Sequence, residues 1–369
     1  DEGGAGMTVR VGIVGTSWWA ESMYLPALAQ HPLGRVTAMC GRDAAKARVV
    51  ADRWGVPEVF ADHEAMFDHV DALIVASSNS SHHPLALAAL QRGLPVLCEK
   101  PLGLNGAEAD ELAAAASLSG AATMTPFTYR FMPVFTELRH RIDGGFVGTP
   151  YHMAARYYTG YARNGEYSWR FDRAEAGSGV LGDLGSHWID LALYLLGPIT
   201  HIGAVVNSTV PRAPRADGAA YDLCEDVAMM TVRFANGAVG QLIVSAVAWE
   251  GTPFGQTHHV EVHGSGGTLY GYNDWDTVQE VRGLRSGETG PAHLLDRTPH
   301  LWAGLRTDTV HNTYRDVFRT TEAMTRGWVM AVAEGRTRQP DIAHGALVQR
   351  ITDAAVRSAA EGGGLLPIG

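Results

Sequence analysis

Two side chains that can carry protons, Asp183 and His187, stand four residues apart in the sequence. On an α-helix this spacing rotates them by about 40° and separates them by roughly 6 Å along the axis, so both can face one cleft. Histidine exchanges protons near neutral pH, and a nearby carboxylate can fix its tautomer or share a substrate hydroxyl group. The pair therefore suits general acid–base catalysis. Spacing alone also allows a helix-capping pair. A zinc site would need a third ligand, and none occurs at a recognisable spacing, so we predict no metal.

Lys100 is a third candidate for the same chemistry. It follows Val96–Cys98, an apolar run typical of a buried strand. Open α/β sheets bind their ligands at the carboxyl ends of parallel strands. An ammonium group there could steady the oxygen of an alcohol while a base takes its proton and a hydride leaves the same carbon. The alternative is an ordinary surface lysine.

The segment 7–126 predicts the domain that positions Lys100. Short β-branched runs alternate in it with alanine-rich stretches whose apolar residues recur every three or four positions. Apolar strands separated by amphipathic helices indicate parallel pairing with helices on both faces, which is a doubly wound sheet. The expected strands are Val9–Val14, Val36–Cys40, Ala72–Ala76, Val96–Cys98 and Ala122–Thr125, and the expected helices are Trp19–Gln30, Asp43–Trp54, Pro84–Arg92 and Glu108–Leu118.

The turn after the first strand has the pattern of a phosphate-binding loop. Gly15 stands where the backbone must bend and pass close to a pyrophosphate, and the following helix offers its free N–H groups to the anion. Ala20 is an accepted variant of the last glycine, whereas Ser17 replaces the second one. The Ser17 hydroxyl could bind a phosphate or crowd it. The alternative is a tight strand–helix turn without a ligand. The residues expected to line the cofactor here are Gly15, Thr16, Ser17, Trp18 and Trp19.

The end of the second strand bears on the choice of cofactor. An acidic residue there would bind the ribose of NAD, whereas an arginine favours the 2′-phosphate of NADP. Gly41 and Arg42 occupy the expected position, and Asp43 falls where a helix N-cap belongs. We therefore favour NADP over NAD. The alternative is that Asp43 reaches the ribose and Arg42 is a solvated charge.

The segment 127–369 predicts a second, α+β domain that carries Asp183 and His187. Helical patterns at Tyr129–Arg141, Gly185–Leu196, Phe318–Glu334 and Leu347–Glu361 accompany several alternating segments. Tight turns separate several of the alternating segments, which indicates a large, mostly antiparallel sheet covered by helices on one face. The segment Asp274–Asp308 is polar and irregular, and we expect a long loop or flap. The expected strands are Tyr151–Tyr158, Ile202–Val210, Val227–Phe234, Val239–Val247, His258–His263 and Thr268–Tyr272.

Composition excludes several classes of function. The 369 residues suffice for two domains. A net charge of -10 argues against nucleic acid or an anionic membrane as partner. The three cysteines are widely separated, which is no disulfide framework and favours a reducing, cytoplasmic location. No apolar stretch approaches the roughly 18 residues of a membrane span. Residues 1–6 are interpreted as a leftover of cloning.

Three further segments resemble the glucose–fructose oxidoreductase/inositol dehydrogenase (Gfo/Idh/MocA) family. They are Ser77–His82 after the third expected strand, Cys98–Pro101 after the fourth, and Gly177–Asp190. Tyr129-Arg130-Phe131, Trp169-Arg170 and Ser358–Gly362 are also similar to that family. The resemblance runs from about Val9 to Gly362.

The resemblance implies an N-terminal Rossmann domain and a C-terminal α/β domain whose open sheet builds homodimer or homotetramer contacts. His187 is implied as the general acid/base, with Asp183 and Lys100 orienting the substrate and tuning the proton relay. Pro101 is often preceded by a cis peptide bond in such proteins. The residues that similarity places at the cofactor are Ser77, Ser78, Asn79, His82, Glu99, Lys100, Trp169 and Arg170.

This sequence departs from the family pattern at three further points. Ser178 replaces the middle of a usual triple glycine, Gly182 stands just before Asp183, and Thr128 stands where an asparagine is common. Together with Ser17, these departures leave the expected fold intact and bear on the details of cofactor binding.

Aromatic residues of the second domain suggest the substrate. Tyr129 and Tyr157 are expected at the substrate together with Lys100, Asp183 and His187, since aromatic faces and phenol groups suit a sugar or cyclitol. Tyr158, Tyr161, Tyr167 and Trp169 lie nearby in sequence, and some of these rings will pack in the core instead. The leading hypothesis is an NAD(P)-dependent dehydrogenase or reductase of a sugar, glycoside, nucleotide sugar or cyclitol. Two alternatives stay open: a redox-neutral enzyme that recycles a tightly bound NAD through a 3-keto glycoside, and a non-catalytic, cofactor-dependent sensor.

Overall fold

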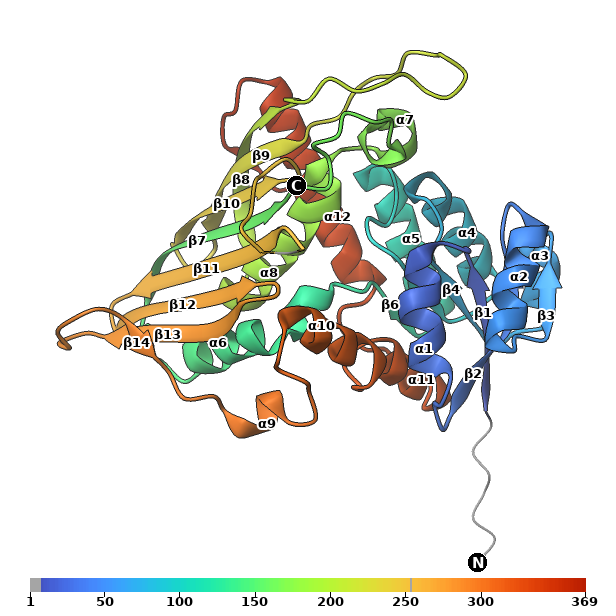
Figure 1. The fold of residues 1–369 in the computed structure, drawn as a ribbon, viewed down its shortest axis with the longest axis horizontal. Helices are drawn as coiled ribbons and strands as arrows, with labels where there is room; N and C mark the ends of the chain where they lie inside the picture. The colour runs from blue at the N-terminus through green and yellow to red at the C-terminus, as the bar shows by residue number, and fades with distance from the viewer. Residues whose placement is uncertain (1–7, 253) are drawn as a thin grey trace, which may run out of the picture. The chain divides into compact units, whose positions relative to one another are not determined.

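The computed structural model describes residues 8–252 and 254–369 (Figure 1). The segment 1–6, interpreted as a leftover of cloning, lies outside the described residues. The chain forms two compact units, one of residues up to Pro126 together with Arg315–Gln349, the other of Phe127–Tyr314 together with Arg350–Gly369. Within the described part of the chain, no helix is long and apolar enough to cross a membrane.

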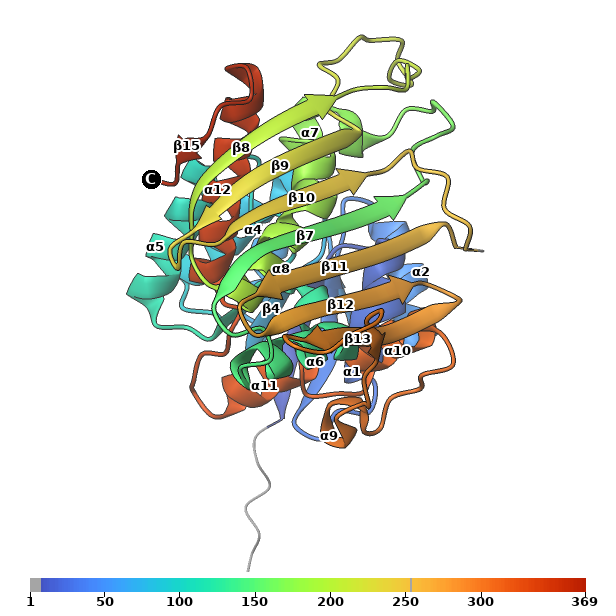
Figure 2. The same ribbon diagram turned by 90° about the vertical axis from the view of Figure 1, so that its left-hand side faces the viewer.

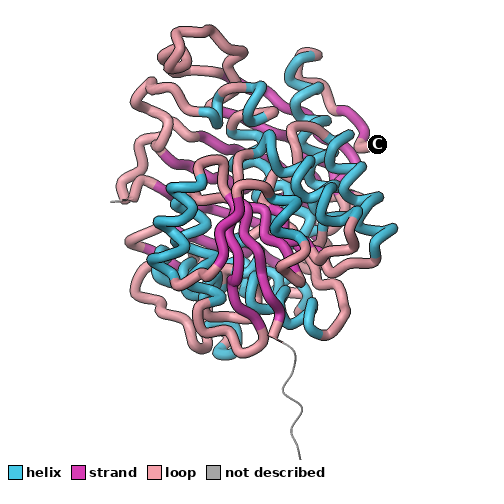
Figure 3. The backbone as a smooth tube through the Cα atoms, turned by 90° about the vertical axis from the view of Figure 1, so that its right-hand side faces the viewer, coloured by secondary structure: helices cyan, strands magenta, loops and turns pink. Residues whose placement is uncertain are grey.

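The first unit contains a six-stranded parallel sheet with the strand order β3-β2-β1-β4-β5-β6. Helices flank these strands on both sides (Figure 3). The order reverses between β1 and β4, which is where doubly wound sheets bind their ligands. The doubly wound Rossmann fold is thereby confirmed. The strands are β1 Val9–Val14, β2 Gly34–Cys40, β3 Glu58–Phe60, β4 Ala72–Val75, β5 Val96–Cys98 and β6 Thr123–Met124.

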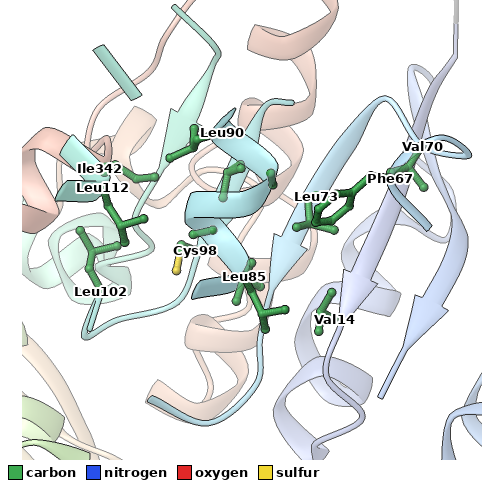
Figure 4. Close-up of a cluster of buried hydrophobic side chains, with 14 of the residues drawn as sticks. Val14, Phe67, Val70, Leu73, Leu85, Leu90, Cys98, Leu102, Leu112 and Ile342 are labelled. Carbon is green, nitrogen blue, oxygen red and sulfur yellow. The ribbon is translucent and has the colours of Figure 1, made fainter. Parts of the chain in front are cut away.

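The apolar composition of these strands has a direct structural cause. Val14, Leu73 and Cys98 are buried in a cluster with Leu85 and Leu112 of the helices that cover the sheet (Figure 4). A strand buried on both faces needs apolar residues at every position instead of at alternate ones. The helices of the sheet are α1 Leu25–Leu28, α2 Ala44–Trp54, α3 His63–Phe67, α4 Asn79–Gln91 and α5 Gly106–Ser119.

The compact units divide the chain differently from the expected domain limits 7–126 and 127–369. Residues 315–349 include α11 Thr325–Ala333 and belong to the Rossmann unit. The indole of Trp328 is fully buried and donates a hydrogen bond to the Ala122 carbonyl oxygen at 3.2 Å. The Thr125 amide donates to the Pro340 carbonyl oxygen at 2.9 Å. These contacts join residues about two hundred positions apart, so local sequence patterns could not reveal them.

The second unit is built on a nine-stranded sheet with the order β14-β13-β12-β11-β7-β10-β9-β8-β15. All neighbouring strands are antiparallel except β7 and β10, so the expected mostly antiparallel sheet is confirmed. The strands are β7 Pro150–Thr159, β8 Ile199–Asn207, β9 Val227–Phe234, β10 Val239–Ser245, β11 Gln256–Gly264, β12 Gly267–Asp274, β13 Val278–Arg285, β14 His293–Leu294 and β15 Leu366–Pro367.

Helices α6 Pro133–Asp143 and α8 Ser186–Leu196 lie against one face of this sheet, and Figure 2 views the opposite face. Along β9, buried and exposed residues alternate, as a sheet with one covered face requires. The unit also contains the short helices α7 Arg173–Ala176 and α9 Pro299–Trp302, and α10 Val310–Arg319 and α12 Ile342–Ala360 each have residues in both units.

Two expectations for the second unit were wrong in detail. The segment 274–308 is not one long loop, because it contains β13, β14 and α9. On β13 only Val281 and Gly283 are buried, so the strand lacks a strong apolar alternation. The helix expected at 129–141 starts at Pro133 instead, after a 3-10 turn, because proline has no amide hydrogen and suits the first position of a helix.

Candidate active site

The turn after β1 passes very close to the turn after β4. Gly15 has a φ of 126°, and a Cβ atom there would lie 2.3 Å from the Ala76 carbonyl oxygen. Its amide donates to the Cys40 carbonyl oxygen at 2.9 Å. Only glycine permits this conformation and this approach. Glycine at this position therefore lets the turns after β1 and β4 meet at the switch point, where doubly wound sheets bind their dinucleotides.

Ser17, the departure from the glycine pattern, is part of the turn itself. Its Oγ accepts a hydrogen bond from the Ala20 amide at 3.3 Å and lies 3.4 Å from the Ala76 carbonyl oxygen, to which it can donate. The serine therefore caps the start of the following helix. Thr16 lies beside Gly41 of the next loop, where a Cβ atom would meet the Thr16 methyl group at 2.8 Å.

The loop after β2 places Arg42 and Asp43 at the surface. The Asp43 carboxylate accepts a hydrogen bond from the Lys46 amide at 3.0 Å and is the N-cap of α2, as its position in the sequence suggested. A carboxylate used in this way is less available to a ribose hydroxyl group.

Glu99 joins the end of β5 to the helix after the phosphate loop. Its buried carboxylate accepts hydrogen bonds from the Trp19 indole at 2.7 Å, the Tyr24 hydroxyl group at 2.5 Å and the Lys100 amide at 3.2 Å. Burial raises its pKa above the usual range, although the three donors oppose the shift. Trp19 and Tyr24 are five residues apart and reach one carboxylate because Ala20–Tyr24 is a π-helical turn. Tyr24 is not predictable from the sequence, because no local pattern marks such a turn.

His82 connects the loops that follow β4 and β5. Its ring is buried, with Nδ1 2.7 Å from the Pro101 carbonyl oxygen and Nε2 3.2 Å from the Ser77 carbonyl oxygen. Burial lowers the pKa of His82, so the ring is neutral and donates to one carbonyl at a time. The Lys100–Pro101 peptide bond is cis, as the resemblance suggested.

Ser77, Ser78 and Asn79 form the turn that opens α4. Ser78 is its N-cap residue, Asn79 is buried, and the Ser77 hydroxyl group accepts a hydrogen bond from Ser81 at 2.6 Å. Trp18, by contrast, is 68% exposed. In the first unit, the structure thus gathers the expected cofactor residues on the loops after β1, β2, β4 and β5.

In the second unit, Asp183 and His187 lie on consecutive turns of unlike geometry. Asp183 belongs to a π-helical turn, Leu181–Gly185, and His187 to α8, so the single α-turn expected for both was wrong. The Tyr161 hydroxyl group donates to the Asp183 carboxylate at 2.7 Å, and Nε of Arg170 lies 3.6 Å from the same oxygen. π-Helical turns occur frequently at functional sites. From the sequence, Tyr161 was expected only as an aromatic residue near the substrate residues, since 22 positions separate it from Asp183.

The His187 ring is 7% exposed and is held by aromatic rings. The ring centroid of Tyr129 lies 4.8 Å away and that of Phe127 6.1 Å away, both edge to face. The hydroxyl groups of Tyr129 and Tyr157 lie 2.9 Å apart, and the Gln256 side chain donates to Tyr129 at 3.0 Å. Burial raises the pKa of both phenols well above the usual range, so both stay protonated.

Trp169 and Arg170 form a 3-10 turn beside Asp183, with the guanidinium group 4.6 Å from the indole centroid. Arg170 thus contributes positive charge to the Asp183 carboxylate. Among residues 8–252 and 254–369, no group of three or more potential metal ligands occurs.

In comparisons with known proteins, both halves of the chain match models of the same protein family. A family model described as an oxidoreductase family with an NAD-binding Rossmann fold matches residues 9–127, and one described as the GFO/IDH/MocA C-terminal domain matches 135–270. Levoglucosan dehydrogenase of Pseudarthrobacter phenanthrenivorans is 30% identical over 344 residues, 84% of each chain. D-glucoside 3-dehydrogenase of Escherichia coli is 28% identical over 243 residues, 63% of this chain and 68% of that protein. A solved levoglucosan dehydrogenase with NADH and L-sorbose has a TM-score of 0.86 at 25% identity, covering 98% of this chain and 99% of that one.

Proposed function

Because the chain belongs to the Gfo/Idh/MocA family of NAD-binding oxidoreductases, we propose that it interconverts an alcohol and a ketone on a sugar, glycoside, nucleotide sugar or cyclitol. The names of its relatives, which include dehydrogenases of levoglucosan, D-glucosides and myo-inositol, support this substrate class. The observation that carries the proposal is the pairing of Asp183 with Tyr161 and Arg170 one turn before the ring-packed His187.

The cofactor supplies a hydride acceptor or donor when bound. The protein's own side chains must therefore accept or donate the proton. We assign its transfer to His187, whose packed ring has a fixed orientation. Asp183 holds the substrate hydroxyl group or passes on its proton, while Tyr161 and Arg170 hold the carboxylate itself. Lys100 donates to the reacting oxygen and stabilises its negative charge.

The remaining expected site residues have supporting roles in this proposal. Gly15, Thr16, Ser17 and the turn Ser77–Asn79 hold the cofactor phosphates and ribose. Tyr129 packs against the His187 ring and supports it, whereas Tyr157 lines the neighbouring pocket and lies closer to the substrate. Glu99 and His82 act by shaping the loops around Lys100.

The choice between NAD and NADP depends on the loop after β2. The solved relative binds NADH, whereas Arg42 and the use of Asp43 as an N-cap favour a 2′-phosphate here. We expect Arg42→Ala to lower the ratio of kcat/KM for NADP to that for NAD by roughly tenfold, the effect of losing a charge-assisted hydrogen bond. An unchanged ratio would remove Arg42 from the cofactor site.

We also propose that the protein is cytoplasmic and forms a homo-oligomer. The three cysteines are free and buried, which supports a reducing, cytoplasmic location. The uncovered sheet face supports a homodimer or homotetramer, since Val205 is 65% and Met229 50% exposed on it.

The direct test is a screen of NAD(H) and NADP(H) against sugars, glycosides, inositols and their keto forms. We expect at least one polyol to reduce the cofactor. Tightly bound cofactor with product formation but no net NAD(P)H turnover would favour the redox-neutral alternative. Ligand binding without any conversion would favour the sensor.

A further inference from the structure

A pocket of about 370 Å³ lies in the second unit next to the candidate catalytic carboxylate. This volume falls within the range of small-molecule sites, roughly 300–1,000 Å³. Its walls come from the end of β7, the turn that follows it, and the loop before β11. The lining residues are Tyr157, Thr159, Gly160, Tyr161, Arg163, Phe254, Gly255 and Gln256.

Tyr161 belongs both to this pocket and to the Asp183 site. Its hydroxyl group donates to Asp183, while the residue itself lines the pocket. Desolvation around its hydroxyl group and the nearby Asp183 carboxylate raise the pKa of Tyr161 well above the usual range, so it remains a donor. A ligand in the pocket and a sugar at Asp183 would therefore both contact Tyr161.

Arg163 gives the pocket a fixed, positively charged edge. It donates to the carbonyl oxygens of Gly160 at 3.1 Å and Ala248 at 3.3 Å, and its guanidinium group lies 3.7 Å from the Trp249 ring centroid. A Cβ atom at residue 160 would come within 2.7 Å of this guanidinium group, so glycine is needed there. Because its hydrogen-bond partners are carbonyl oxygens, no carboxylate among the described residues neutralises this charge.

Aromatic rings form the remaining walls. Tyr157 and Tyr161 line the pocket together with the polar residues Thr159 and Gln256, and Phe254 is 53% exposed. Exposed aromatic rings beside a few polar donors suit a flat ring that has an apolar face and a polar edge.

We propose that this pocket is a second-ring subsite, which holds the ring attached to the sugar undergoing oxidation. The inference rests on the proposed function and makes the substrate a glycoside instead of a free monosaccharide. The attached ring would stack on Phe254 and receive hydrogen bonds or positive charge from Arg163. Both an aryl group and a second sugar have a ring face that can stack on Phe254.

Binding of three β-D-glucosides in the presence of NADH tests the subsite, with the methyl, phenyl and glucosyl (cellobiose) compounds as probes. We expect the phenyl or the glucosyl compound to bind at least about tenfold more tightly than the methyl glucoside by titration calorimetry, since a stacked ring contributes roughly 1 kcal/mol or more. The tighter of the two identifies the kind of ring. Phe254→Ala and Arg163→Met should reduce this preference, whereas Leu118→Ala, at a residue 90% exposed on α5, should retain it.

The proposal is overturned if the methyl glucoside binds as tightly as both larger probes, or if both pocket variants keep the wild-type preference. Thermal unfolding of each variant shows whether it is folded. If the screen finds no oxidation of any sugar, the proposed function fails, and the binding preference still decides whether the subsite exists.

Discussion

At the scale of single residues, the candidate site depends on side chains that hold other side chains. Asp183 is held by Tyr161 and Arg170, and His187 by the rings of Phe127 and Tyr129. Precise positioning of this kind contributes strongly to rate, because small displacements of a reacting group raise the barrier.

His82 offers a test of positioning in the first unit. Its ring contacts the Pro101 carbonyl oxygen, directly after Lys100, and the Ser77 carbonyl oxygen in the loop after β4. We therefore expect His82→Leu to lower kcat roughly tenfold or more, with little change in the Kd of NADH. His82→Asn, which keeps an N–H group near the Nδ1 position, should restore part of kcat. In a Lys100→Met background, the same substitutions should lower kcat only slightly further.

Additive losses in the double variants would show that His82 does not act through Lys100. A weaker Kd of NADH with an unchanged kcat would instead assign His82 to the Ser77 side and thus to cofactor binding.

At the scale of elements, the sequence predicted most of the sheet and helix order. The Rossmann strands were predictable because burial on both faces demands uninterrupted apolar runs, as in Ala72–Val75. β13 was missed because its buried face offers only Val281 and Gly283. The π-helical turns at Ala20–Tyr24 and Leu181–Gly185 leave no periodic signal over five residues, so the partners Tyr24 and Tyr161 were not predictable.

Glu99, at the junction of β5 with the π-helical turn, should make the stability of the protein depend on pH. Its pKa is raised by burial, so between its unfolded value near about 4.3 and the higher folded value the native state binds more protons than the unfolded state. This contribution stabilises the fold fully below that window and is lost as the pH rises through it.

The Glu99→Gln variant lacks this ionisation, so it should lose less stability than the wild type as the pH rises. We expect the difference in unfolding free energy, wild type minus variant, to decrease in urea titrations as the pH rises above the unfolded value of about 4.3. A difference that is constant or increases with pH would contradict a raised pKa at Glu99.

At the scale of the whole molecule, the fold order and the family follow from the sequence, whereas the limits of the compact units do not. Residues 315–349 return to the first unit through contacts such as Trp328 with Ala122, which only the folded chain reveals. The uncovered face of the nine-stranded sheet is the feature that most directly concerns assembly.

We expect charge on that face to disrupt self-association. Val205→Lys combined with Met229→Lys should convert the proposed oligomer to a monomer in light scattering after gel filtration, because both side chains are exposed on neighbouring strands and two like charges would meet the partner's face. Leu118→Lys on α5 is the matched control and should leave the mass unchanged. A monomeric wild type, or an oligomer that persists in the double variant, would contradict assembly through this face.

The central claim is that Lys100, Asp183 and His187 carry the proton side of hydride transfer. Its most direct test is kcat for His187→Ala and Lys100→Met on the best substrate of the screen, measured together with the Kd of NADH. We predict that each variant loses about 10²–10⁴-fold in kcat, the usual contribution of a positioned acid or base, while the Kd of NADH stays near that of the wild type. A kcat equal to that of the wild type in either variant would contradict the claim.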